Sequence, residues 1–411
     1  MRRSVVPLLL VVLVASLLPA SALAQPRQGD VVAGSYIVTL VAGARPGAVA
    51  GEHASRHGAV VDHVYRHALR GYAARMSASQ ARAVAADPRV AGVERDRVVT
   101  TAAKPGEGSA AAQTLPTGID RIDGELSSTA SGDGSGSVNV DVAIIDTGID
   151  VDHPDLNVVG GRNCSTGASF DDGNGHGTHV AGTVAAKDDA TGVVGVAPGA
   201  RLYAVRVLNN AGSGTTSSVI CGIDWVTANA STIEVANMSL GGSGSDSTCG
   251  GSDSYHNAIC RSVNAGVTYA VAAGNSSADA NGFRPATYAE VITVSALADF
   301  NGKAGGGAAP TCRSDVDDTF ADFSNYGADV DLIAPGVCIN STWKGGGYNT
   351  ISGTSMASPH VAGAAALYKA SNPGASPEQV KTALQASGNL DWDNRDDGDS
   401  IKETLLNVAA L

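Results

Sequence analysis

The sequence predicts a large doubly wound α/β domain with a mostly parallel sheet, preceded by a small α+β domain of ferredoxin-like topology. Three observations lead to this prediction. From about residue 138 onward, short apolar runs alternate with helical patterns, which is typical of a buried parallel sheet. Residues 35–99 instead follow the order β-α-β-β-α-β. Between the two, residues 100–117 are rich in Ala, Gly and Pro, which indicates an exposed linker.

Start and stop signals bound the elements of the small domain. Gly58 ends a first helix, Ser77 or Ser79 opens a second, and Pro88 stops it. We expect strands at 35–40, twice within 60–76 and at 90–99, and helices at 46–57 and from Ser77 or Ser79 to about 87.

The large domain begins with a nearly continuous apolar strand at 138–145, as expected for a strand buried on both faces. Near its end, Ser376 as cap, Pro377 at the first helical position and Gln379 predict a clean helix start. Between these we expect strands at 202–208, 235–240, 267–272, 291–295 and 330–333, and helices at 176–186, 218–229, 255–265 and 361–368.

Residues 1–24 have the pattern of a secretory signal. Arg2 and Arg3 precede an apolar run at 5–18, and Ala22 and Ala24 form a small-residue cleavage site. The alternative, a membrane anchor, needs a longer run. We therefore divide the chain into a signal peptide (1–24), a small domain (25–105) and a large domain (106–411), with 106–117 as its linker, and expect the protein outside the cell.

Export permits disulfides, and all six cysteines lie in the large domain. Fifteen pairings are possible. Cys249 and Cys260 flank a short Gly/Ser-rich loop, and Cys312 and Cys338 bracket residues 319–336, which predicts these two bridges and leaves Cys164–Cys221 by elimination. No Cys pair has zinc-ligand spacing, and the chain has no nucleotide-binding P-loop, so we expect no organic cofactor.

The net charge of −13 is unevenly distributed. Residues 25–105 carry 11 Lys and Arg against 6 Asp and Glu, whereas residues 106–411 carry 14 against 34. The acidic domain argues against nucleic-acid and membrane partners, and the opposite signs predict attraction between the domains. The small domain also holds four His residues, at 53, 57, 63 and 67. Either they are solvated, or their protonation changes how the domains interact; we favour release of the small domain in acid.

Three polar motifs fall at strand ends or helix starts of the large domain. Asp146 follows the first strand, His176 opens the next helix, and Ser355 opens the late buried helix. Each has an ordinary explanation alone: a turn residue, a packed His and a helix cap. Sites of doubly wound sheets lie at the carboxyl ends of the strands. There, Asp, His and Ser together supply an orienting acid, a general base and a nucleophile.

Residues 118–411 resemble the subtilases, subtilisin-like serine endopeptidases, and within them the secreted proteinase K-like branch. The resemblance rests on four stretches: VAIIDTGI at 142–149, GHGTHVAG at 175–182, AAGN at 272–275 and GTSMASPH at 353–360. Residues 35–99 resemble the family's inhibitory propeptide. The resemblance implies a zymogen that its own catalytic domain cuts between residues 100 and 117.

The resemblance also implies site residues. Ser355 would be the nucleophile, His176 the base, Asp146 its orienting partner and Asn275 an oxyanion-hole donor. The His residues at 179 and 360 would be structural. A polypeptide substrate would pair with two backbone edges, which gives broad specificity because main-chain pairing reads no side chains. These edges are Gly212, Ser213 and Gly214 on one side, and Ser239, Leu240, Gly241 and Gly242 on the other.

Structural calcium is the cofactor that the resemblance implies. Asp299 would be a ligand, together with the carbonyls of Pro285 and Thr287, although a solvated loop Asp is the alternative. We expect a monomer whose partners are its substrates and its own propeptide.

Two other functions are weighed against this interpretation. The residues around Ser355 half match the nucleophile elbow of α/β-hydrolases, but that fold orders its triad Ser, Asp, His. An inactive binding protein of the same fold is the second alternative. It is disfavoured because all four catalytic positions are filled, and a serine-directed covalent probe distinguishes it.

Overall fold

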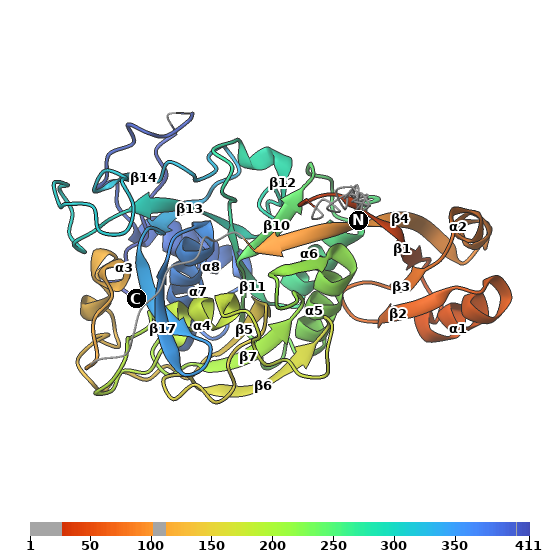
Figure 1. The fold of residues 1–411 in the computed structure, drawn as a ribbon, viewed down its shortest axis with the longest axis horizontal. Helices are drawn as coiled ribbons and strands as arrows, with labels where there is room; N and C mark the ends of the chain where they lie inside the picture. The colour runs from red at the N-terminus through yellow and green to blue at the C-terminus, as the bar shows by residue number, and fades with distance from the viewer. Residues whose placement is uncertain (1–26, 102–111, 400) are drawn as a thin grey trace, which may run out of the picture.

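A computed structural model describes residues 27–101, 112–399 and 401–411. The expected signal peptide and most of the linker lie outside these residues. The described chain forms a small domain at one end of the molecule and a much larger one beside it (Figure 1). One strand of the small domain, β4 (Val90–Thr101), runs into the large domain.

The small domain has the predicted β-α-β-β-α-β order and is one antiparallel sheet, β4-β1-β3-β2, with two helices packed on it. Its helices end and begin as the sequence predicts. Gly58 adopts a left-handed conformation after α1, and Ser77 forms a capping box with Gln80 before α2. The other elements are β1 (Val31–Leu40), α1 (Pro46–His57), β2 (Val60–Tyr65), β3 (Gly71–Arg75) and α2 (Ala78–Ala85).

The large domain is built on one sheet with the strand order β14-β13-β11-β9-β5-β7-β6, to which β15 adds beside β13. All its pairings are parallel except that of β14. This confirms the predicted doubly wound, mostly parallel sheet. Its strands are β5 (Asp141–Asp146), β6 (Val158–Asn163), β7 (Arg201–Arg206), β9 (Val235–Met238), β11 (Thr268–Ala272), β13 (Ile292–Ala298), β14 (Thr319–Phe320) and β15 (Leu332–Pro335).

Helices cover both faces of this sheet, so each strand is buried twice. Along β5, Val142 and Ile144 pack into the core beneath α4, α7 and α8, while Ala143 and Ile145 pack into the core beneath α5 and α6. Four consecutive apolar residues, 142–145, between the aspartates at the two ends of β5 are the consequence. The helices are α3 (Thr117–Arg121), α4 (His176–Ala185), α5 (Thr216–Ala228), α6 (Ser254–Asn264), α7 (Thr354–Ser371) and α8 (Pro377–Ser387), with 3₁₀ turns η1 (Gly124–Leu126) and η2 (Ala280–Gly282).

Several short strands were not predicted. The hairpin of β16 (Ile339–Trp343) and β17 (Gly347–Ile351) escapes the pattern because polar residues take several of its buried positions. Two of them, Ser341 and Thr342, donate hydrogen bonds to the backbone carbonyls of residues 179 and 178. The predicted strand at 235–240 is in fact divided: β9 ends at Met238 and a new strand begins at Leu240. This strand, β10 (Leu240–Ser243), and the strands β8 (Ser213–Thr215) and β12 (Phe283–Arg284) lie outside the parallel sheet.

The structure confirms the three predicted disulfides, Cys164–Cys221, Cys249–Cys260 and Cys312–Cys338. The first two tie a loop to a helix, α5 or α6, and the third ties a loop to the turn before β16. Among the helices of the described residues, none is long and apolar enough to cross a membrane.

Candidate active site

Asp146 and His176 meet at the carboxyl end of β5. The His176 ring contacts a carboxylate oxygen of Asp146 through Nδ1, at 2.8 Å, and both side chains are buried. The same oxygen accepts a hydrogen bond from the N–H of Thr147 at 2.7 Å. Nε2 of His176 is buried and has no hydrogen-bond partner among the described residues. The contact with Asp146 therefore orients the ring and leaves its other nitrogen open.

The start of α4 holds His176 in this position. Asp172 accepts hydrogen bonds from the backbone N–H groups of Asn174, Gly175 and Thr178, at 2.8–3.0 Å, and so satisfies donors that a helix start leaves unpaired. Only glycine fits at position 177, because a Cβ there would lie 2.1 Å from the carbonyl oxygen of Gly148.

Ser355 lies in the first turn of α7 and is fully buried in the described structure. Its hydroxyl donates to the carbonyl oxygen of Ser239 at 3.0 Å, and the Ser239 hydroxyl donates to the carbonyl oxygen of Ser355 at 2.8 Å. The second bond has a clear cause. Residue 359 is proline, which has no N–H to offer the Ser355 carbonyl four residues earlier in the helix.

Asn275 lies beside Ser355 through its contacts with Thr354. Its side-chain oxygen accepts hydrogen bonds from the N–H and the hydroxyl of Thr354, both at 2.9 Å. Asn325 holds the turn that carries Asn275, because its amide donates to Ala273 and its oxygen accepts from Ser276. The structure thus brings Asn275 and Ser355 to the start of the same helix.

The two other His residues of the motifs lie in the core. Burial lowers the pKa of His179 to about 3 and the pKa of His360 to about 4. His179 contacts the carbonyl oxygens of Ile339 and Asn349, and His360 contacts that of Met356. Both rings are therefore neutral at physiological pH and fix the packing around α4 and α7.

The two predicted backbone edges are occupied by β4 of the small domain. Val98, Val99 and Thr100 pair antiparallel with β8, and Thr100 and Thr101 pair with β10 on the other side. The Thr101 N–H also donates to the carbonyl oxygen of Gly212 at 2.9 Å. Ser239 directly precedes β10, and Gly242 pairs with β12 on the far side of β10. The strand β4 of the small domain therefore lies between the two edges that were expected to bind a substrate.

Carboxylates and polar groups, rather than ion pairs, join the two domains. Asp96 accepts from the N–H and hydroxyl of Ser217 at the start of α5, and Glu94 accepts from those of Ser254 at the start of α6. Helix starts favour negative charge. In return, Asp224 of α5 accepts the backbone N–H groups of residues 66–68.

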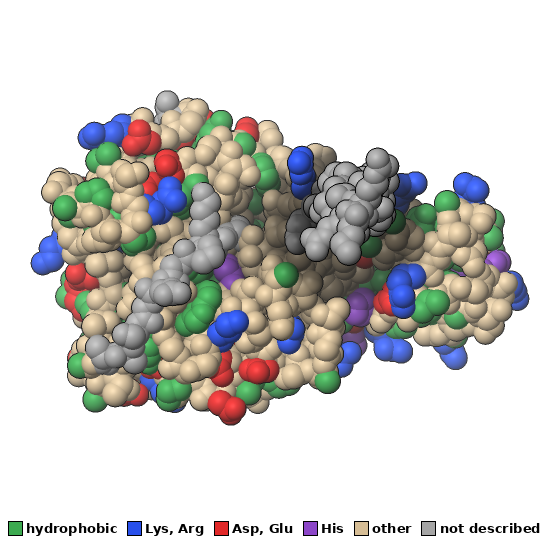
Figure 2. Space-filling model, in the orientation of Figure 1, with side chains coloured by type: hydrophobic (Ala, Val, Ile, Leu, Met, Phe, Trp, Pro, Cys, Tyr) green, Lys and Arg blue, Asp and Glu red, His purple; other side chains and the backbone are tan. Residues whose placement is uncertain are grey.

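The predicted charge attraction therefore has no direct contact in the interface. Among the described residues, no ion pair links the small domain to the large one. On the face drawn in Figure 2, most acidic side chains in view lie on the large domain, and several basic ones lie on the small domain. Any electrostatic attraction between the two domains therefore acts over distances longer than that of an ion pair.

The predicted calcium site is wrong in its grouping of residues. Asp299 follows β13, whereas Ala286, between Pro285 and Thr287, accepts a hydrogen bond from Thr293 at the beginning of β13. Thr293 and Asp299 lie six residues apart along this extended segment, which corresponds to roughly 20 Å. Asp299 therefore lies far from the carbonyls of Pro285 and Thr287. Asp299 instead faces the Arg121 guanidinium at 3.5 Å. A few residues after Thr287, the backbone carbonyls of residues 289 and 291 accept hydrogen bonds from the ammonium of Lys381.

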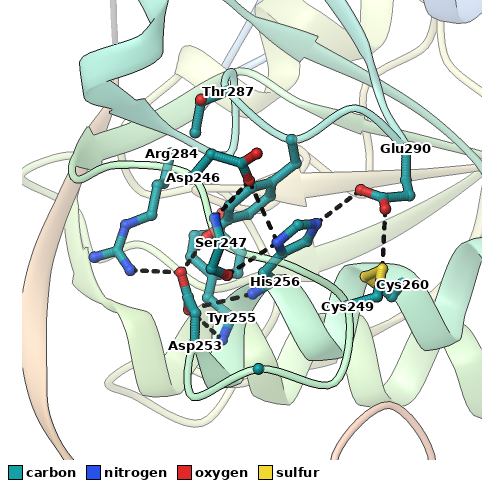
Figure 3. Close-up of polar contacts among 12 residues, drawn as sticks. Asp246, Ser247, Cys249, Asp253, Tyr255, His256, Cys260, Arg284, Thr287 and Glu290 are labelled. Atoms are coloured by element: carbon teal, nitrogen blue, oxygen red, sulfur yellow. Dashed lines mark hydrogen bonds and ion pairs between the residues drawn. A yellow bond between two sulfur atoms is a disulfide. The ribbon is translucent and has the colours of Figure 1, made fainter.

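One group of His, Cys and Glu side chains has ligand atoms that lie within 4.8 Å of one another (Figure 3). It comprises Cys249, His256, Cys260 and Glu290. The two sulfurs are bonded to each other, and His256 already contacts Glu290 at 2.7 Å and Ser247 at 3.1 Å. The cluster therefore fastens the loop after β10 to α6.

A doubly wound parallel sheet with Asp, His and Ser in this chain order is characteristic of subtilisin-like serine proteases. Residues 137–401 match the Subtilase family, and residues 35–102 match the Peptidase inhibitor I9 family. The chain belongs to the subtilase family. It is a subtilisin-like serine endopeptidase that carries an I9 inhibitor domain as its propeptide.

Similar proteins include Subtilisin DY of Bacillus licheniformis, 42% identical over 304 residues, which are 73% of this chain and 99% of that protein. An alkaline protease of Alkalihalobacillus alcalophilus is 41% identical over 300 residues, 73% of this chain and 69% of that protein. The solved structure of a cold adapted subtilisin-like serine proteinase is similar with a TM-score of 0.57 at 37% identity, over 71% of this chain and 97% of that one.

Some residues that shape the site were not found from the sequence. Asp172 stands four residues before His176, and an acid just before a helix start is a signal that could have found it. Asn325 had no such signal, because its partners lie some 50 residues away in the chain.

Proposed function

We propose that the mature protein is a secreted serine endopeptidase of broad specificity that acts through Asp146, His176, Ser355 and Asn275. The observation that carries this proposal is the 2.8 Å contact of Asp146 with His176, with the open Nε2 of that ring facing away from Asp146. Ser355 stands at the start of the helix α7, which packs against α4.

In this mechanism Ser355 Oγ leaves the Ser239 carbonyl and gives its proton to Nε2 of His176 as it attacks the scissile carbonyl carbon. Asp146 holds the proton on Nδ1 and stabilises the imidazolium that forms. The Asn275 amide and the Ser355 N–H then stabilise the oxyanion. His176 passes its proton to the leaving amine, an acyl-enzyme remains, and water hydrolyses it by the same steps in reverse.

We further propose that residues 25–105 are the propeptide, that residues 106–411 are the catalytic domain, and that the chain is cut between Thr100 and Thr117. The pairing of β4 with β8 and β10 supports this, because a substrate strand would take the same path to Ser355. Pairing through backbone alone favours broad specificity. Three disulfides agree with export into an oxidising compartment, and we propose a monomer.

A fluorophosphonate probe tests the nucleophile. The purified processed protein should be labelled at Ser355, and Ser355→Ala should abolish both labelling and casein hydrolysis. Substantial hydrolysis by the variant would refute the assignment. In a protease-free host, the same variant should accumulate as an uncut chain, and N-terminal sequencing would show whether something other than this site makes the cut.

A further inference from the structure

The disulfide Cys249–Cys260 lies against two side chains that can bind a metal ion. Glu290 contacts both of its neighbours: one carboxylate oxygen lies 2.9 Å from the Cys249 sulfur, and the other lies 2.7 Å from Nε2 of His256 (Figure 3). A disulfide sulfur carries no hydrogen, so the first contact is not a hydrogen bond. His256 and Cys260 are four residues apart in α6 and share one face of that helix.

The His256 ring is held in the orientation that a metal ligand needs. It is buried and stacks on the Tyr288 ring, with the centroids 4.1 Å apart and the planes 3° from parallel. Its Nδ1 contacts the Ser247 hydroxyl at 3.1 Å and lies 3.5 Å from a carboxylate oxygen of Asp246. Histidine ligands in metal sites commonly have such a partner on the nitrogen that does not bind the metal, because it fixes the ring. Nε2 therefore faces Glu290 in a fixed position.

The disulfide itself is open to a reductant from one side, because Cys249 is exposed whereas Cys260 is buried. A small dithiol can attack the Cys249 sulfur, which breaks the S–S bond, forms a mixed disulfide and releases Cys260 as a thiol. The second thiol of the reductant then displaces Cys249. The dithiol leaves as a cyclic disulfide, having given two electrons and two protons, and two cysteine thiols remain beside His256 and Glu290.

We propose that this reduced cluster binds one zinc ion through the sulfurs of Cys249 and Cys260, Nε2 of His256 and one carboxylate oxygen of Glu290. Zinc takes four such ligands as a tetrahedron, which places the ligand atoms roughly 3.3–3.8 Å apart. The four atoms already lie within 4.8 Å of one another, so the two sulfurs must separate and the other atoms shift little. The two thiol protons leave to solvent as the zinc–sulfur bonds form. Calcium and magnesium prefer oxygen ligands, whereas half of this set is sulfur.

The zinc ion would fasten the loop at 244–253, which joins β10 to α6, after reduction has freed it. At the end of this loop, a carboxylate oxygen of Asp253 accepts from Arg284 of β12 and from the Tyr288 hydroxyl, both at 2.9 Å. The strand β12 pairs in turn with β10. Zinc would therefore replace the covalent link to α6 by a coordinate one and keep the loop in place. The site is separate from the proposed catalytic residues and does not depend on their roles.

Zinc titration of the full-length Ser355→Ala protein tests the proposal, because this chain should not digest itself. The protein is reduced with dithiothreitol and separated from it without oxygen. Isothermal titration calorimetry should then show one zinc ion more than in the matched control, which carries Cys249→Ser and Cys260→Ser and is treated identically. The unreduced parent should lack this ion. Cobalt in place of zinc should give the charge-transfer absorption of a metal bound to thiolates, and Ser247→Ala should weaken zinc binding roughly 10–100-fold.

Should the reduced protein unfold, Cys249→Asp tests the same site without a reductant, because it places a carboxylate where the sulfur was and keeps the other two disulfides. This variant should bind one zinc ion, and adding His256→Gln should weaken the binding at least about 10-fold. Equal zinc stoichiometry in the reduced parent and its double-serine control would overturn the proposal. So would a folded Cys249→Asp protein that binds no zinc, and the cluster would then be a structural disulfide only.

Discussion

Ser239 and Ser355 exchange hydrogen bonds, each hydroxyl donating to the other's carbonyl oxygen, at 2.8 and 3.0 Å. The Ser239 hydroxyl replaces the donor that Pro359 cannot supply inside α7. The backbone of the proposed nucleophile therefore depends on a residue that begins the proposed substrate-binding edge.

Ser239→Ala should destabilise the protein by about 1–3 kcal/mol, because the buried Ser355 carbonyl loses its hydroxyl donor. We expect a lower Tm and a reduced kcat, since the first turn of α7 is less well fixed. Ser245→Ala, an exposed serine on the following loop, is the matched control. If both variants keep the parental Tm, the Ser239 hydroxyl is dispensable for the helix.

Asn275 has two separable tasks: its oxygen holds Thr354, and its amide is proposed to stabilise the oxyanion. Asn275→Asp keeps the acceptor and removes the donor, so its kcat should fall strongly while its Tm changes little. Loss of the corresponding donor in a subtilisin slows turnover about 10²–10³-fold. Asn275→Ala should lose both kcat and stability. Comparable kcat in Asn275→Asp and the parent would remove Asn275 from the oxyanion hole.

The three disulfides close loops of different length, with sequence separations of 57, 26 and 11 residues. Replacing each pair by serine should cost about 4 kcal/mol for Cys164–Cys221, about 3.5 for Cys312–Cys338 and about 3 for Cys249–Cys260, because longer loops restrict the unfolded chain more. Denaturant unfolding in the Ser355→Ala background measures these costs. A reversed ranking would mean that local contacts, not chain entropy, determine the stabilisation.

Acid should weaken propeptide binding through His63. Burial where the propeptide meets α5 lowers the pKa of His63; Asp62 and Asp96 oppose the shift, and Arg162 of the catalytic domain reinforces it. A lowered pKa in the docked state means that binding is full above the usual His pKa of about 6.5 and falls as the pH drops below it. The loss approaches tenfold in affinity for each unit of pKa shift.

His63→Gln should flatten the dependence of propeptide inhibition on pH between 5 and 8, whereas the exposed His67→Gln should not. His53, in contrast, is fully buried and contacts Asp87 at 3.0 Å. Parallel inhibition profiles for His63→Gln and the parent would rule out this switch and leave only the long-range attraction, which added salt should weaken.

The sequence revealed what is encoded locally. Gly58, Ser77 and Ser376 act as expected at helix ends, and Asp146 and His176 meet at the carboxyl end of β5, where sites of parallel sheets lie. It could not show which distant groups meet. Asp299 was expected to be a metal ligand, but the fold places the Arg121 guanidinium beside it.

The position of β4 between β8 and β10 has a consequence for the proteins that this enzyme can digest. When the propeptide leaves, the edges of β8 and β10 are exposed, and the gap between them is wide enough for one strand. Only a chain whose own backbone donors and acceptors are free on both sides can fill it, so a segment already paired in a helix or sheet must first detach. Cleavage should therefore depend on how readily a segment of the substrate unfolds locally. A stably folded protein should resist cleavage except at its most flexible loops and at its chain ends.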